Sequence, residues 1–262
     1  MSVQKFDRIL KCNNVTGTGR IDAVDKTGKC GGLAVSGWSG DQNQPLGRRG
    51  EGKDDWWNIE VFRREKDMVS ILRNHLESDI YVVHRLDQPV EGILVFAKTR
   101  RAAAGLNRQI TEGSMRKLYH AVVEVQPQAD FAVCPDFTSW HTLTDYLVKD
   151  GRNNKSFVVK KETKDAKRAE LKYRILKYKT TSETTHTGLA LVEIELLTGR
   201  HHQIRVQMAH AGLPLLGDRK YNLNNTPSSP LALCAVSLTF RHPLTKKQMI
   251  FEVQPQSDAF TL

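Results

Sequence analysis

The chain has 262 residues, 39% of them apolar, which is enough for a full hydrophobic core in a single domain. Its 39 Lys and Arg against 29 Asp and Glu give a net charge of +10, which favours a polyanion such as RNA, although basic ribosome-binding and lipid-surface proteins share this excess. No apolar run approaches the roughly 18 residues of a membrane span, and the N-terminus has no apolar signal core, so we expect a soluble, cytoplasmic protein. The four cysteines are scattered without a C-x-x-C pair, so neither a compact zinc site nor a disulfide framework is indicated.

The first 60 residues differ in composition from the rest. Ten of the 18 glycines lie within residues 17–52, and residues 36–53 almost lack aliphatic side chains. Such a sequence buries too little apolar surface to offset chain entropy, so it predicts irregular or mobile structure, in which Trp38, Trp56 and Trp57 are the candidates for docking onto the body. We therefore divide the chain into an atypical glycine-rich segment, residues 1–60, and a main domain, residues 61–262.

Regular structure is predicted to resume at Asp67, a suitable N-cap that apolar residues follow at helical spacing. Residues 102–110 form a second predicted helix, closed by Gly113.

Further along the chain, alternating patterns predict strands over residues 117–125, with Tyr119 on the apolar face, and over residues 189–197. A turn then leads to a helix with Ile204 and Met208 inward, ended by Gly212 and Pro214. Strands outnumber helices and recur in hairpin-like order, so we predict a single α+β domain around a mixed, largely antiparallel sheet.

Between these strands lies a strongly basic stretch. Residues 149–174 hold ten Lys or Arg against four acidic residues, a net charge of +6. Such a run is either a solvated connection or a track for phosphates, and charge alone leaves both open, the solvated connection being the commoner structure.

The most informative string is H-R-L-D-Q-P-V-E-G-I-L-V-F-A-K at residues 84–98. Its first half is predicted to connect two strands, and such loops often carry catalytic groups. Asp87 is thus either a catalytic carboxylate or a turn residue before Pro89, with Arg85 as its surface ion-pair partner.

A second string favours catalysis: L-L-T-G-R-H-H-Q-I-R-V-Q-M-A-H-A-G-L-P-L-L-G-D-R-K-Y at residues 196–221. Together the two strings resemble the RluA-type family of RNA pseudouridine synthases, whose signatures are H-R-L-D and, later, T-G-R-x-H-Q-I-R, G-x-P and G-D-x-x-Y. With weaker matches between and after them, the resemblance covers about residues 67–253. It implies a pseudouridine-synthase-like catalytic domain that isomerises uridines in structured ribosomal or transfer RNA, with no metal and no cofactor, and we expect a monomer.

The resemblance also implies roles for individual residues. Asp87 is the catalytic carboxylate, and Arg205 of Q-I-R keeps it charged and fixes its rotamer. Tyr119, in K-x-Y, lies near the uracil and could relay a proton, although it could equally be an aromatic residue that fills a strand face. The implied substrate-binding residues are Arg85, which helps hold the flipped nucleotide, and Arg200, His202 and Gln203.

Some features of the strings depart from the family or allow other interpretations. The family often has Arg-x-Thr-Ser-Gly where this chain has Gln-Pro-Val-Glu-Gly, and we expect Glu91 to add negative charge near the RNA path. Gly199 and Gly217 are expected at permissive turns. The histidines match no common zinc spacing, so structural roles are expected for them.

Two other functions remain open. One is an RNA-binding or ribosome-assembly protein on the same fold that has lost activity, because the family's usual N-terminal strand and loop are not recognisable here. The other is a hydrolytic enzyme that uses Asp87 with His84, although no second carboxylate or nucleophile motif accompanies them.

Overall fold

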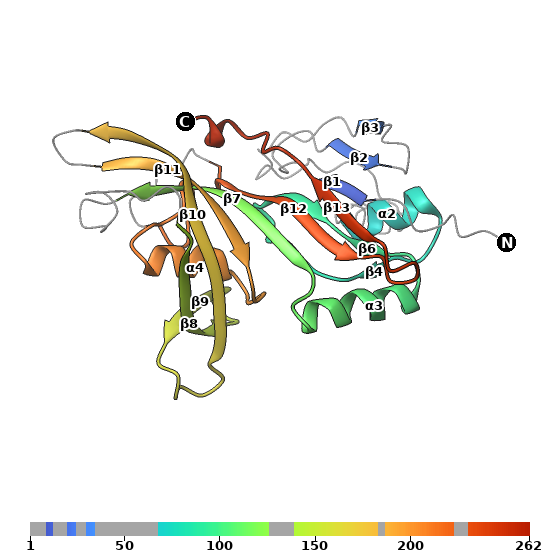
Figure 1. Cartoon of the computed structure of the whole chain (residues 1–262), viewed down its shortest axis with the longest axis horizontal. Coiled ribbons are helices and arrows are strands. Elements are labelled where there is room, and N and C mark those ends of the chain that lie inside the picture. Colours follow the sequence, from blue (N-terminus) through green and yellow to red (C-terminus); the bar gives the residue numbers. More distant parts are fainter. Residues whose placement is uncertain are drawn as a thin grey trace, which may run out of the picture.

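The structure, a computed structural model, describes residues 9–12, 20–24, 30–34, 68–125, 139–182, 187–222 and 230–262. Eleven strands join in one sheet with the order β3-β2-β1-β5-β12-β7-β11-β10-β8-β9, and β13 adds to β12 (Figure 1). The strands of this sheet are β1 (Ile9–Cys12), β2 (Arg20–Val24), β3 (Cys30–Ala34), β5 (Glu91–Leu94), β7 (Arg116–Val125), β8 (His141–Asp150), β9 (Lys155–Val159), β10 (Lys167–Ser182), β11 (Thr187–Leu196), β12 (Leu233–Arg241) and β13 (Gln248–Glu252). Strands β4 (Tyr81–Val82) and β6 (Phe96–Ala97) form a separate pair.

Antiparallel pairing dominates the sheet. Among the described strands, only β5 and β12 pair in parallel. The prediction of a mixed, largely antiparallel sheet with few helices is therefore confirmed. The strand predicted over residues 117–125 is β7, and the one predicted over residues 189–197 is β11.

Three of the strands come from the glycine-rich segment. β1 pairs with β5, joining Leu10 to Leu94, and β2 and β3 continue the sheet outward. The expectation of irregular structure is wrong for these short stretches, because backbone hydrogen bonds to an existing strand edge need little apolar surface from the segment itself. The boundary near residue 60 stays a prediction, and Trp38, Trp56 and Trp57 lie outside the described residues.

Helices cover two different parts of the sheet. The helices are α2 (Met68–Leu76), α3 (Arg100–Thr111), α4 (Gln203–His210) and the short 3₁₀ turn η2 (Asp258–Phe260). α3 buries Ala102, Ala103 and Leu106 against Leu238 and Phe240 of β12. Its N-cap is Thr99, whose hydroxyl accepts the N–H of Ala102, and Gly113 follows its end in a left-handed conformation, as predicted.

The largest core packs α4 against the long central strands. Ile204 and Met208 of α4 lie in one cluster with Tyr119 of β7, Ile175 of β10 and Ile194 of β11. The inward positions predicted for Ile204 and Met208 are thus confirmed. In Figure 1 this half lies to the left, while α3 lies under the right half, so the central strands join two separately packed regions.

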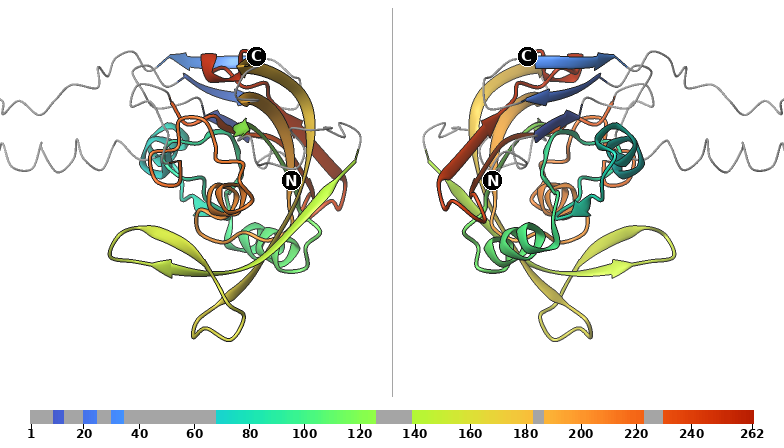
Figure 2. Two further views of the ribbon diagram at one scale, coloured as in Figure 1. Left: turned by 90° about the vertical axis from the view of Figure 1, so that its left-hand side faces the viewer. Right: turned by 90° about the vertical axis from the view of Figure 1, so that its right-hand side faces the viewer.

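The basic stretch forms the far edge of the sheet. Strands β8 and β9 and the start of β10 project from the body, as the end-on views of Figure 2 show. No helix within the described parts of the chain is both long and apolar enough to cross a membrane.

Candidate active site

Asp87 lies in the loop between β4 and β5, as predicted. Its carbonyl oxygen accepts the N–H of Val90 at 2.9 Å, which closes a tight turn, and its side chain is 30% exposed. The turn leads into Gly92, which has φ of 122° and lies against β12 so closely that a Cβ atom would come within 2.3 Å of the Ala235 carbonyl oxygen. Only glycine fits there, which explains the glycine of the first motif and fixes the loop to the sheet.

The second motif brings α4 to the same place. His202 is the N-cap of α4 and has φ of 53°, a left-handed conformation that costs energy for a residue with a side chain. Gln203 stabilises this turn from within: its Oε1 accepts from the Thr198 hydroxyl and the Arg200 N–H, and its Nε2 donates to the Glu170 carbonyl oxygen. These contacts use both ends of the Gln203 amide and hold the turn before α4, and the predicted substrate contact of Gln203 stays a prediction.

Arg205 connects two carboxylates. Its side chain is only 5% exposed, and its Nε and Nη2 donate to Asp218 at 2.8 and 2.6 Å in a bidentate pair. Its Nη1 lies 3.6 Å from Oδ2 of Asp87. Burial alone would lower the pKa of the guanidinium, but the hydrogen bonds and charge of Asp218 and the charge of Asp87 outweigh burial and raise the pKa, so Arg205 stays cationic.

Asp218 is fully buried, and its carboxylate accepts more hydrogen bonds than that of Asp87, the predicted catalytic residue. Besides Arg205, it accepts the backbone N–H groups of Lys220 and Tyr221. Gly217 before it has φ of 76°, and a Cβ there would meet the Pro230 carbonyl oxygen at 1.9 Å, so the permissive turn expected at Gly217 is confirmed. The expectation of a permissive turn at Gly199 is wrong, because the backbone of Gly199 does not have a left-handed φ.

A chain of hydrogen bonds orients His202 toward Asp87. The Tyr221 hydroxyl accepts the Ser156 N–H at 2.8 Å and lies 2.8 Å from Nδ1 of His202, to which it can donate its own hydrogen. That arrangement leaves the ring hydrogen on Nε2, which faces Oδ2 of Asp87 at 3.6 Å. Burial and the charges of Arg205, His201 and Lys220 lower the pKa of His202 to about 3, so the ring is neutral at pH 7.

Two further residues of the motifs have shifted pKa values. Tyr119 is 6% exposed, and burial together with the negative charge of Asp87 raises the pKa of its hydroxyl, which keeps its proton. His84 accepts the Val95 N–H at 3.4 Å, and burial and the charge of Lys117 lower its pKa to about 4. A neutral His84 bonded to the backbone has the structural role expected of it and is poorly suited to act with Asp87 in hydrolysis.

The other predicted residues lie around this centre. Arg85, two residues before Asp87 in the chain, is exposed, whereas Arg200 donates to the Arg168 carbonyl oxygen at 3.0 Å. The expectation for Glu91 is wrong: its side chain is 3% exposed and takes backbone hydrogen bonds from Gln256 and Ser257, so it faces the interior. No group of three or more metal-ligating side chains occurs among the described residues.

A partly exposed Asp in a strand-connecting loop, facing a buried Arg on a helix, is the arrangement that the resemblance predicted. Residues 45–210 match the RNA pseudouridylate synthase family. The chain therefore belongs to this family, which confirms the predicted family.

Curated relatives agree with this assignment, and a solved structure shares the fold. The ribosomal large subunit pseudouridine synthase C of Buchnera aphidicola subsp. Schizaphis graminum is 35% identical over 73% of this chain and 55% of that protein. The tRNA pseudouridine synthase C of Vibrio parahaemolyticus is 29% identical over 71% of this chain and 76% of that protein. The structure of Human RNA Pseudouridylate Synthase Domain Containing 1 shares the fold, with a TM-score of 0.59 and 17% identity over 97% of this chain and 85% of that chain. The chain spans about half the length of the curated relatives that match it first.

Sequence reasoning gave no role to three residues that complete the site. Asp218 and Tyr221 stand in the string G-D-R-K-Y, which was part of the resemblance, so a signal for them existed. Ser156 had none, because its backbone contact to Tyr221 joins segments far apart in sequence.

Proposed function

We propose that the chain is an RNA pseudouridine synthase that isomerises uridines in structured ribosomal or transfer RNA, with Asp87 as the catalytic carboxylate and no cofactor. The observation that carries this proposal is the position of Asp87: its side chain is 30% exposed, while Arg205 and His202, each 3.6 Å away, are 5% exposed. A substrate can therefore reach the carboxylate, and the groups that hold it are shielded from water.

The reaction breaks the N-glycosidic bond, turns the freed uracil and joins its ring carbon five to the same anomeric carbon. An ionised carboxylate can act there as a nucleophile or as a base. Arg205 stabilises the negative charge on Asp87, and the neutral His202 offers an N–H in the same direction. Tyr119, whose hydroxyl keeps its proton, can donate to the base while it is detached.

The names of the relatives support RNA as the substrate class, since those proteins are called synthases of the ribosomal large subunit or of tRNA. Arg85 is exposed two residues before Asp87, and a planar cation can fill the gap left by a flipped nucleotide. A cytoplasmic location and a monomeric state stay predictions.

The decisive test is Asp87→Asn, which keeps the shape of the side chain and removes its charge. We expect pseudouridine formation to vanish in ribosomal and transfer RNA purified from cells that lack the gene, while RNA binding persists. Asp79→Asn, at an exposed position after α2, is the matched control and should leave both properties unchanged.

Turnover by a clean Asp87→Asn preparation would refute the assigned role. Failure of the wild-type protein to form pseudouridine in either RNA fraction, with binding intact, would instead favour an RNA-binding protein without activity.

A further inference from the structure

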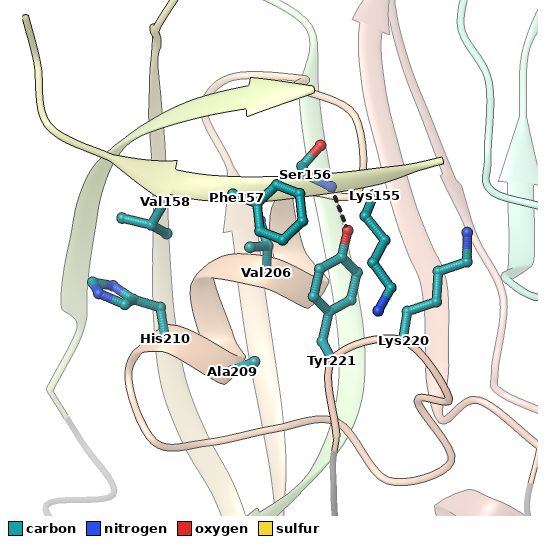
Figure 3. Close-up of a pocket in the computed structure, with 9 residues that line it drawn as sticks. All are labelled: Lys155, Ser156, Phe157, Val158, Val206, Ala209, His210, Lys220 and Tyr221. Carbon is teal, nitrogen blue, oxygen red and sulfur yellow. Dashed lines mark hydrogen bonds between the residues drawn. The ribbon is translucent and has the colours of Figure 1, made fainter. Parts of the chain in front are cut away.

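A pocket of about 270 Å³ lies beside the catalytic site, between the edge strand β9 and helix α4 (Figure 3). Its residues are Lys155, Ser156, Phe157, Val158, Val206, Ala209, His210, Lys220 and Tyr221. None of the roles assigned to the catalytic residues uses this space. Tyr221 connects the pocket to the catalytic site. It lines the pocket, its hydroxyl bonds to His202, and its ring lies 5.4 Å from Cζ of Arg205.

The lining combines an aromatic surface with positive charge. Phe157 is 49% exposed, although it stands in the basic stretch where apolar side chains are few. Lys155 and Lys220 lie on one side of it, and the lining contains no acidic residue (Figure 3). The Lys220 ammonium donates to the Asn154 carbonyl oxygen at 2.6 Å, which holds this cation at the mouth of the pocket.

We propose that this pocket binds one unstacked nucleotide of the RNA whose uridine is modified, outside the catalytic site itself. The base stacks on Phe157 against the apolar wall of Val158 and Val206, and its phosphate meets Lys155 and Lys220. RNA is the occupant that the lining favours, because proteins hold splayed-out bases on aromatic side chains and backbone phosphates on lysines. The volume lies just below the range of about 300–1,000 Å³ typical for drug-sized ligands, and so suits a single base.

This proposal rests on the proposed function and names a contact with the same substrate. It also gives a reason for the position of the pocket beside the catalytic site. A nucleotide bound against Tyr221 lies next to the hydrogen bonds that orient His202 toward Asp87. Filling the pocket therefore anchors the RNA at a fixed distance from the carboxylate.

The test measures RNA binding in an Asp87→Asn background, where turnover does not interfere, with labelled ribosomal and transfer RNA from cells that lack the gene. Adding Phe157→Ala should weaken binding roughly tenfold, as expected for the loss of one base–aromatic stack, whereas Phe157→Trp should bind like the parent. Ile250→Ala, which removes an apolar side chain 56% exposed on β13, is the matched control and should leave the affinity unchanged. In the active protein, Phe157→Ala should raise KM for RNA and leave kcat unchanged at saturation.

Equal affinity of the Phe157→Ala and parent proteins would overturn the proposal and leave the pocket and the β9 edge to a protein partner. Equal weakening by Phe157→Ala and Phe157→Trp would also overturn it, since a stacking surface survives the second change. If the wild-type protein forms no pseudouridine but Phe157→Ala still weakens binding with rescue by Trp, the proposed function fails while the nucleotide subsite stands.

Discussion

The catalytic centre and the basic hairpin region lie close together and use charge in opposite ways. Around Asp87, the charged groups of Arg205 and Asp218 are almost completely buried and joined by short, directional hydrogen bonds. In the hairpin region, residues 149–174, most of the ten cations are exposed, and Arg168 and Arg174 are paired with Glu170 and Glu193. Buried charges interact strongly with their neighbours and need a partner of opposite charge, whereas exposed charges interact weakly and are screened by salt.

This difference predicts where the protein tolerates substitution. A change in the centre leaves an uncompensated charge or donor in a medium of low polarity, so it should affect folding and catalysis together. A change of an exposed cation in the hairpin region alters only the attraction to a polyanion. The following experiments test that separation, beginning with the largest expected effect.

Asp218→Asn should be the most damaging single change. It keeps the shape of the side chain but leaves the Arg205 guanidinium without its bidentate partner, and breaking a buried ion pair in this way costs about 3–5 kcal/mol. Arg205 would also turn toward Asp87, so activity should fall beyond the loss of folded protein. Urea unfolding and single-turnover pseudouridine assays measure the two effects.

The matched control is Glu195→Gln, the same chemical change at the ion pair with Arg116, which is 54% exposed. Surface pairs contribute about 0–1 kcal/mol, so this variant should lose little stability. Similar losses for the two variants would contradict the distinction between buried and exposed charge.

Tyr221→Phe should have an intermediate effect. The variant keeps the ring under Arg205 but removes the hydroxyl that accepts from Ser156 and orients His202. Leaving a partly buried N–H unsatisfied costs about 1–3 kcal/mol, and kcat should fall because His202 loses its fixed tautomer. Tyr173→Phe removes a hydroxyl that makes none of these contacts and serves as the control; an equal fall in kcat would exclude the orienting role.

Two histidines of the motifs, His84 and His202, should make stability depend on pH. Burial lowers the folded-state pKa of His84 to about 4 and of His202 to about 3, below the ordinary 6.5. Between these values and pH 6.5 the unfolded chain binds protons that the folded protein excludes, so the free energy of unfolding should decrease as pH falls through this window. His84→Asn should flatten that decrease. An unchanged slope for His84→Asn would show that folding does not lower the pKa of His84.

Much of the centre was predictable because its contacts are local or carried by long motifs. The strands around Asp87, the inward face of α4 and the turn at Gly217 all follow from patterns within a few residues. The pairing of Arg205 with Asp218 was missed, although Asp218 stands in the second string. The bond between Ser156 and Tyr221 was not predictable, since it joins residues that only the tertiary fold brings together. The short strands β1–β3 were missed for a related reason: their pairing depends on the open edge of β5 rather than on their own apolar content.

The smallest effect on folding is expected in the basic hairpin region. The lysines to be neutralised together are all exposed, in the β9–β10 connection and at the start of β10: Lys160, Lys161, Lys164 and Lys167. Replacing them with Gln should leave stability within about 0.5 kcal/mol, because surface substitutions away from packed side chains seldom do more. RNA affinity at low salt should nevertheless fall, and the slope of log K against log salt should become shallower by about 0.7–0.9 for each phosphate that the variant no longer neutralises.

A control set of four exposed cations lies at the other end of the molecule, on α3 and in the turn between β12 and β13: Arg100, Arg101, Arg108 and Lys247. Neutralising this set changes the net charge of +10 by the same amount, so it reproduces any effect that depends on total charge alone. A shallower slope for the hairpin set only would identify residues 149–174 as the track for phosphates. Equal slopes for the two sets would make that stretch a solvated connection, and RNA would then be attracted by the field of the whole protein rather than held by the hairpin region.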